Sequence, residues 1–271
     1  MQFTKIRLAG RTNIDMPFFG LRPSNPYILK QADGLGPPEI DVFLSGGIYQ
    51  GRKPQDREII VRAGLNPNYA VGQTAASMRT TLYGLLTPGG NDNITVQLMN
   101  GPVVVVQTSG YVKRIEIVPF SKDPEVQITI ACAKPYLYEP TEKTLGLLEL
   151  GTPASPFTIE NPGSVTAGFY LELTYNANQD TYWTLYSGGA GVAPKFRINY
   201  PFLNGDILMI DTREGQRSIK RTRGSSTINV LYALSTDSTW PTLHPGTNTF
   251  WTSSTSFNWG KAIFTPRYWG I

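Results

Sequence analysis

Apolar and polar residues alternate along short stretches over most of this chain, which is the period expected of half-buried β-strands. The clearest stretch is Glu125–Lys134, in which every second residue from Val126 to Cys132 is apolar. Asp123-Pro124, two residue types that favour turns, come directly before it. We therefore predict that Gly110–Pro140 is a β-hairpin that closes one domain and leads the chain into a second.

Residues 1–140 contain further extended runs that Pro and Gly interrupt. The EIIVR run Glu58–Arg62 is the clearest of them, and the turn-rich segment Gln31–Glu39 is predicted to be a surface loop. Residues 94–106 predict a second hairpin, with Asn100-Gly101 as a type I′ turn. Weaker strand candidates are Gln2–Leu8, Asp15–Phe19 and Asp41–Leu44.

The periodicity changes from two to about 3.6 only once, at about residues 73–87, where we predict the single α-helix of the chain. Thr74 can cap its N-terminus, and Pro88-Gly89-Gly90 would end it. We expect its apolar stripe to pack on the sheet of its own domain; a partner-binding groove is the alternative. The stripe consists of Ala75, Met78, Leu82, Leu85 and Leu86.

Beyond a predicted linker at residues 141–156, the pattern of residues 157–271 is all β. Strand candidates recur at roughly ten-residue spacing with turn residues between them, which predicts a β-sandwich or jelly roll. They are Phe157–Glu160, Gly168–Tyr175, Tyr182–Tyr186, Lys195–Tyr200, Ile207–Asp211, Arg217–Arg221, Thr227–Leu234, Asn248–Trp251 and Lys261–Phe264.

Composition supports a mainly β fold in two domains. The 271 residues include 27 Gly and 21 Pro but only 16% charged residues, which suits short strands joined by turns. The net charge of +4 is too small, spread over this length, to imply nucleic-acid binding by itself. No run approaches the about 20 apolar residues of a membrane span, and no signal-like segment opens the chain, so we expect synthesis in a cytoplasm and no membrane insertion.

Catalytic chemistry is poorly represented. One Cys and one His cannot build a metal cage, and no nucleophile motif accompanies His244, so we predict neither an enzyme nor a cofactor or metal site. Cys132 lies in the apolar phase of its strand, which indicates a small buried hydrophobe in preference to a reactive thiol. Asp206 and Asp211 are interpreted as turn and edge residues instead of paired carboxylates.

Two surface features leave alternatives open. The basic run Lys220, Arg221 and Arg223 indicates a solvated strand face or a protected edge, and a polyanion site is the alternative. The last third of the chain is rich in aromatic residues, most of which should be core. Exposed aromatic side chains can stack on sugars or anchor an interface, and the candidates for such contacts are Trp251, Trp259 and Trp269.

Several short motifs, in their order along both domains, resemble those of the siphophage distal tail protein family. Each fits a turn or strand end and none is catalytic. They are the exit Ala133–Tyr138 of the first domain, then Ile159–Gly163, Leu203–Asp211, Leu243–Asn248 and Tyr268–Ile271.

That resemblance implies a structural virion protein at the distal end of a long, non-contractile tail. The first domain would form a ring, most often a homo-hexamer, and the second would be a galectin-like β-sandwich on its outside. The ring would join the tail tube protein to a tail-tip fibre or lysin protein, and genomic DNA would pass through it without sequence-specific binding. The alternative function is a glycan-binding module that contacts host saccharide through exposed aromatic residues.

Overall fold

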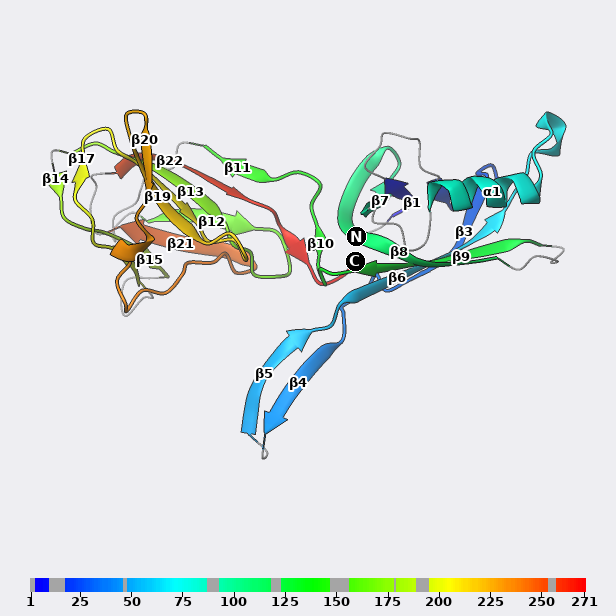
Figure 1. Ribbon diagram of the computed structural model, residues 1–271, viewed down its shortest axis with the longest axis horizontal. Helices are drawn as coiled ribbons and strands as arrows, with labels where there is room; N and C mark the ends of the chain where they lie inside the picture. Colours follow the sequence, from blue (N-terminus) through cyan, green and yellow to red (C-terminus); the bar gives the residue numbers. More distant parts are fainter. Residues whose placement is uncertain are drawn as a thin grey trace. The chain divides into compact units, whose positions relative to one another are not determined.

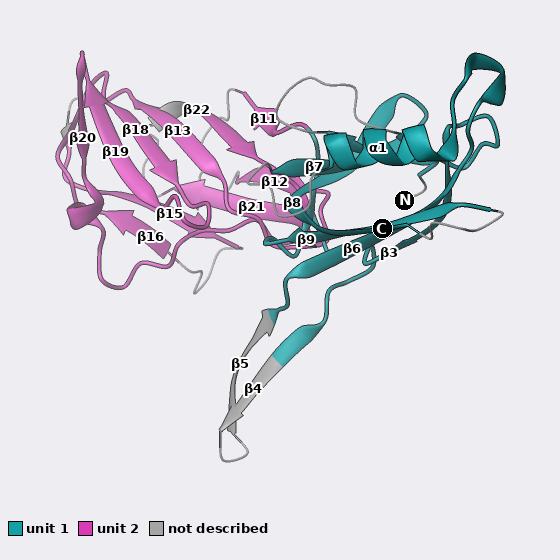
Figure 2. Cartoon of the chain, turned by 45° about the vertical axis from the view of Figure 1, so that its right-hand side comes forward, with its two compact units in different colours: residues 1–140, 268–271 teal, residues 141–267 magenta. Residues whose placement is uncertain are grey.

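The computed structural model describes residues 3–9, 18–45, 48–86, 93–117, 123–146, 156–177, 179–188, 195–252 and 257–271; within residues 42–53 and 257–259 and at residue 179 the description covers the backbone alone. The described chain is mainly β, with one α-helix (Figure 1). It divides into two compact units, Met1–Pro140 with Tyr268–Ile271, and Thr141–Arg267 (Figure 2).

Unit 1 contains a closed seven-stranded β-barrel, in which the pairing runs in the order β8-β7-β1-β2-β3-β6-β9 and returns to β8. Neighbouring strands are antiparallel except β2 and β3, which are parallel. The strands are β1 (Lys5–Ala9), β2 (Phe18–Gly20), β3 (Tyr27–Asp33), β6 (Arg57–Leu65), β7 (Ile94–Asn100), β8 (Val103–Ile117) and β9 (Glu125–Cys132). Closure gives each of these seven strands two neighbours within the barrel.

The long strand β8 closes the barrel by changing partner at Gly110. Up to Gly110, which pairs with Ile94, it follows β7, and from Tyr111, which pairs with Ala131, it follows β9. A Cβ at Gly110 would lie 2.5 Å from the carbonyl oxygen of Ala131, so only glycine lets the strands approach this closely. A register shift follows between Val112 and Arg114, which explains why the alternation of this stretch is irregular.

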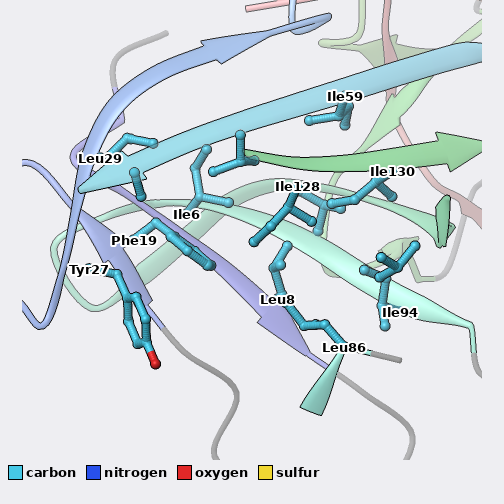
Figure 3. Close-up of a cluster of buried hydrophobic side chains, with 14 of the residues drawn as sticks. Ile6, Leu8, Phe19, Tyr27, Leu29, Ile59, Leu86, Ile94, Ile128 and Ile130 are labelled. Carbon is cyan, nitrogen blue, oxygen red and sulfur yellow. The ribbon is translucent and has the colours of Figure 1, made fainter. Parts of the chain in front are cut away.

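Side chains from all around the barrel meet in one core. Ile6 of β1, Ile59 of β6 and Ile128 of β9 are each 0% exposed, and Figure 3 shows them with Leu8 and Leu86 in a single cluster. The predicted alternation of β9 is confirmed, because the side chains of Val126, Ile128, Ile130 and Cys132 are all buried. Cys132 is thus a buried thiol, and burial raises its pKa to about 11.

Helix α1 (Ala75–Leu85) forms where the sequence predicts it. Thr74 accepts a hydrogen bond from the backbone of Ser77, whose hydroxyl accepts one from the Thr74 backbone, so a capping box starts the helix. Met78, Leu82 and Leu86 are buried in the core of the barrel. The stripe therefore packs on its own domain, as expected. Pro88–Gly90, the predicted stop, lies outside the described residues.

The remaining strands of unit 1 lie beside the barrel or apart from it. β10 (Leu137–Tyr138) pairs with β8. β4 (Ile40–Ser45) and β5 (Ile48–Pro54) pair with each other in a separate two-stranded sheet, and the described residues give them no further strand partner. The hairpin is closed at its base by the Gln55 amide, whose backbone N–H donates to Glu39.

In unit 2, two larger sheets share one core. A six-stranded sheet has the order β11-β22-β13-β18-β19-β20, and a four-stranded sheet has the order β12-β21-β15-β16. Leu171 and Ile210 of the first sheet and Trp183 and Phe250 of the second all belong to the same buried cluster. Their bounds are β11 (Lys143–Leu145), β12 (Phe157–Asn161), β13 (Tyr170–Tyr175), β15 (Trp183–Ser187), β16 (Lys195–Ile198), β18 (Ile207–Asp211), β19 (Ser218–Arg223), β20 (Ser226–Asn229), β21 (Gly246–Thr252) and β22 (Phe257–Phe264).

Three short elements complete unit 2. Strands β14 (Gln179–Asp180) and β17 (Phe202–Leu203) pair with each other, and η2 (Leu231–Ala233) is a 3-10 turn. The strand predicted at Thr227–Leu234 is therefore wrong in its second half, where the chain leaves β20 and turns.

Four further expectations need correction. The turn of the hairpin predicted at residues 94–106 has Gly101 and Pro102 at its centre, because Asn100 pairs with Val103; with φ +60° at Gly101 and the negative φ of proline it matches type II′ instead of type I′. Gln31 to Asp33 belong to β3, so the predicted loop begins only at Gly34. The predicted linker contains β11, which pairs with β22. Tyr268–Ile271 belong to unit 1, not to the second domain.

Candidate functional site

The most tightly bonded polar group of unit 1 is the guanidinium of Arg57, which is 3% exposed. It donates hydrogen bonds to four backbone carbonyls, those of Gly34, Gly36, Pro135 and Trp269, at 2.5 to 2.9 Å. We call these five residues the Arg57 cluster. Burial lowers the pKa of Arg57 from its ordinary value, although an arginine this basic stays protonated. The cluster ties three distant segments to the start of β6.

Residues 268–271 are bound to the barrel unit along their whole length. The Tyr268 side chain is buried and its hydroxyl donates to Glu139 at 3.2 Å; burial, followed by the charge of Glu139, raises the pKa of Tyr268 to about 12. The Ile271 N–H donates to the Leu35 carbonyl at 3.2 Å. A Cβ at Gly270 would lie 2.7 Å from the backbone of Gly36. The YWGI motif thus serves packing in unit 1.

Of the three tryptophans proposed for saccharide or partner contact, Trp269 belongs to unit 1 and Trp251 to unit 2. Trp269 is half-buried and meets the Tyr136 ring edge-on at 5.2 Å. Trp251 is half-buried and stacks on Tyr186 at 3.8 Å, and these two residues are cross-strand partners of β21 and β15. The side chain of Trp259 lies outside the described residues.

The asparagines of two sequence motifs hold loops in unit 2. Asn161 is 1% exposed; its amide donates to the carbonyls of Val165 and Leu243, and its oxygen accepts from Gly163. Asn248 accepts from the His244 N–H and donates back to the His244 carbonyl at 2.7 Å. Both motifs are therefore structural, because their polar side chains satisfy backbone groups that strands would otherwise leave unpaired.

Asp206 of the third motif is fully buried and receives two hydrogen bonds of 2.7 Å from the fork of Arg223. It also accepts from the Leu203 N–H, which closes the predicted Asn204-Gly205 turn. Burial alone would raise the pKa of Asp206, but the bonds from Arg223 and Leu203 outweigh it and hold the pKa below its ordinary value.

Asp206→Asn is expected to lower the free energy of unfolding at pH 7 by about 2 kcal/mol, because a charge-assisted pair becomes a neutral contact. Since the folded-state pKa is depressed, this contribution is present above the unfolded pKa of about 3.9 and is lost as the pH falls through the folded value. Urea unfolding of both proteins, at pH 7 and at steps below pH 4, measures the difference. A gap that stays constant at low pH would contradict the assignment.

The basic run of β19 does not lie at a sheet edge, and its Lys220 and Arg223 side chains are exposed. β19 pairs with β18 on one side and β20 on the other. Arg221 points inward, 8% exposed, and donates to the Tyr200 hydroxyl at 2.7 Å, whereas Arg223 is bound to Asp206. Two of the three cations therefore already have partners, which leaves little of the run for a polyanion.

The described residues show no arrangement suited to catalysis at His244. Its ring is exposed and lies 3.3 Å from the Thr166 hydroxyl, beside an open cleft of about 360 Å³ that Trp240 also lines. One side of Trp240 is covered by Arg217 and it packs on Phe196. Within the described part of the chain, no three His, Cys, Asp or Glu residues lie close enough to hold a metal ion. Among the helices described, none has the length and apolar character needed to cross a bilayer.

Comparison with known proteins places these structural motifs in a family context. Residues 162–268 match the model of the siphovirus-type tail component, C-terminal domain. No curated protein sequence matches the chain. Among solved structures, that of SPP1 Dit, described as a paradigm of hub adsorption apparatus in phages infecting Gram-positive hosts, has a TM-score of 0.63 at 16% identity and covers 97% of this chain and 98% of its own.

A second solved structure, the phage P2 baseplate in its activated conformation with calcium, covers 98% of both chains but has a TM-score of 0.45 at 10% identity. The match to SPP1 Dit runs through both units, and the matched family domain contains two of the unit 2 motifs whole, Leu203–Asp211 and Leu243–Asn248. The resemblance of this chain to the siphophage distal tail protein family is therefore confirmed, by the tail component domain at residues 162–268 and by a fold shared with SPP1 Dit.

Proposed function

We propose that this protein is a structural component of the distal end of a long, non-contractile phage tail. The observation that carries the proposal is the tail component domain at residues 162–268, set in a chain whose fold matches a hub protein over 97% of its length. In this role the protein resides in the virion, is assembled in the host cytoplasm, and joins the tail tube protein to a tail-tip fibre or lysin protein.

Unit 1 is the part that we expect to form the ring, with six copies around the path of the DNA. A ring needs two different patches on each copy that complement each other and close on themselves. Each of the seven barrel strands already has two neighbours within the barrel, so we expect strand addition to use other elements. The β4–β5 hairpin supports this, since its strands pair only with each other among the described residues.

Light scattering and electron microscopy of the purified full chain test the ring. We expect a species of six times 29.9 kDa and ring-shaped particles. A variant in which a short Gly-Ser linker replaces residues 41–53 should keep the thermal transition of unit 1, because the barrel order does not include β4 or β5, and should be monomeric. A wild-type protein that stays monomeric at high concentration would overturn the ring, and an unchanged oligomer in the variant would exclude the hairpin.

The alternative function is saccharide binding by unit 2, the domain expected from the sequence to be galectin-like. The half-buried stack of Trp251 on Tyr186 is the aromatic surface that favours it, because one indole face can still meet a sugar ring. Titration of the full chain with host-wall saccharides, compared with Trp251→Ala, separates the two functions. Saccharide-specific binding that the substitution abolishes would support the alternative; an absence of heat at high saccharide concentration would remove it.

A further inference from the structure

A row of outward-facing side chains crosses five strands of unit 1 in register. Phe18 of β2 lies opposite Arg7 of β1, Arg7 opposite Gln97 of β7, Gln97 opposite Gln107 of β8, and Gln107 opposite Tyr138 of β10. Register partners of paired strands point to the same face, and the flanking residues Ile6, Leu8, Val96, Leu98 and Val106 are buried in the core. We call these five residues the outer row.

Two cations meet on one aromatic ring at the end of this row. The Lys5 ammonium lies 4.7 Å and the Arg7 guanidinium carbon 5.4 Å from the centroid of the Phe18 ring. The ring attracts each cation, but it also brings two like charges together. Within the described residues neither cation has an ion pair, and a third, Lys134, lies over Tyr138 at the other end of the row.

The Arg7 Nε adds a second observation, because it is buried and has no hydrogen-bond acceptor. Its cross-strand neighbour Gln97 also has a buried oxygen without a partner, while the Gln97 amide nitrogen donates to Gln107 at 3.3 Å. A water molecule could join Nε of Arg7 to this oxygen. The positive charge of Lys5 and Arg7, more than the single Nε donor of Arg7, favours the binding of an anion here.

Three other cations of the barrel lie beside carboxylates. Lys30 pairs with Glu125, Lys113 lies 3.1 Å from Glu58 and Arg114 lies 3.1 Å from Glu116. These cations of β3 and β8 lie beside carboxylates, whereas Lys5, Arg7 and Lys134 lie beside aromatic rings.

We propose that the outer row, with Lys5 and Lys134, binds the sugar-phosphate backbone of duplex DNA without reading its sequence. Phosphate contacts in proteins come from Arg, Lys, Gln and Tyr side chains, which are the polar residue types of this row. Lys5 and Arg7 are two residues apart on one strand, so both cations lie on the same face and can contact one phosphate backbone. The row offers no helix to enter the major groove, so contact stays with the backbone.

The proposal takes its setting from the proposed tail function, but its test does not depend on ring formation. Fluorescence anisotropy of the purified full chain, with labelled duplexes of two unrelated sequences and a series of salt concentrations, gives the affinity and its salt slope. The wild type should bind both duplexes equally, and its affinity should fall steeply with salt.

The decisive variant is Lys5→Gln with Arg7→Gln, and its matched control is Lys113→Gln with Arg114→Gln, which removes the same charge from ion-paired sites. We expect the first to make the slope of log affinity against log salt shallower by about 1.8, since each phosphate contact contributes about 0.9, and to weaken binding about tenfold at low salt. The control should leave the slope unchanged. Lys5→Arg with Arg7→Lys keeps both charges and should bind like the wild type.

Three results would overturn the proposal. Equal losses in the two double variants would mean that net charge alone attracts DNA. Tight binding of poly-glutamate with no binding of DNA would assign the row to an acidic protein. If the Lys5→Gln, Arg7→Gln variant keeps the wild-type salt slope and the wild-type melting temperature, these two residues do not contact DNA. A monomeric wild type that still shows the predicted slope would contradict the ring and leave this inference standing.

Discussion

Arg57→Met is expected to lower the free energy of unfolding of unit 1 by about 3–5 kcal/mol, the range found when a buried charged network loses its centre. Methionine fills much of the same space but cannot donate, so the carbonyls of Gly34, Gly36, Pro135 and Trp269 would all lose this partner. Calorimetry should show that the unfolding transition of unit 1 occurs at a lower temperature than in the wild type. Hydrogen exchange should show the loss of protection in residues 34–36 and 268–271.

Arg62→Met is the matched control, because Arg62 lies on the same strand β6 with its side chain at the surface, bound to Gln127 and Gln31. Its cost should be about 0.5 kcal/mol or less, as for other surface substitutions. If the two variants lose the same stability, or if the loss from Arg57→Met falls on unit 2, the Arg57 cluster does not hold unit 1 together.

Gly110→Ala is expected to destabilise the barrel by about 3 kcal/mol, at the upper end of the costs of overpacking. The new methyl group would lie 2.5 Å from the Ala131 carbonyl oxygen and 2.9 Å from the Cys132 sulfur, and both atoms belong to β9. Because β8 changes its partner at this residue, the strain falls on the seam that closes the barrel. Denaturant unfolding measures the loss, and exchange of β9 amides locates it.

Gly84→Ala provides the control for this substitution. Gly84 lies in α1 with open space at the position of a Cβ, so alanine should stabilise the helix by about 0.5–1 kcal/mol. If Gly110→Ala lowers the free energy of unfolding no more than Gly84→Ala does, then β8 and β9 can separate at this residue without cost.

The parts of the fold that are predictable from the sequence are those that local patterns determine. The period of Val126 to Cys132 identifies the buried face of β9, and Thr74 with the stripe of Met78 and Leu82 identifies α1. Closure of the barrel is not predictable in this way, because it depends on β8 meeting both β7 and β9, and nothing local marks Gly110 as the point of exchange.

The candidate site residues also divide into those that local patterns predict and those that depend on distant contacts. Asn204-Gly205 and Asn248 are predictable because turn chemistry acts over a few residues. Arg57 gives no signal, since its acceptors are backbone carbonyls 21, 23, 78 and 212 positions away. The outer row has a weak signal in the sequence, the alternation of Lys5 and Arg7 with Ile6 and Leu8, which places both cations on one face of a strand.

The return of residues 268–271 to unit 1 sets an order for folding during synthesis. Domains made first usually fold first, but Arg57 can bond to the Trp269 carbonyl, and Leu35 to Ile271, only after the whole of unit 2 has been translated. Unit 2 can pack its core earlier. Unit 1 is therefore completed only after unit 2 has been synthesised, so a nascent chain lacks part of the unit proposed to form the ring until then.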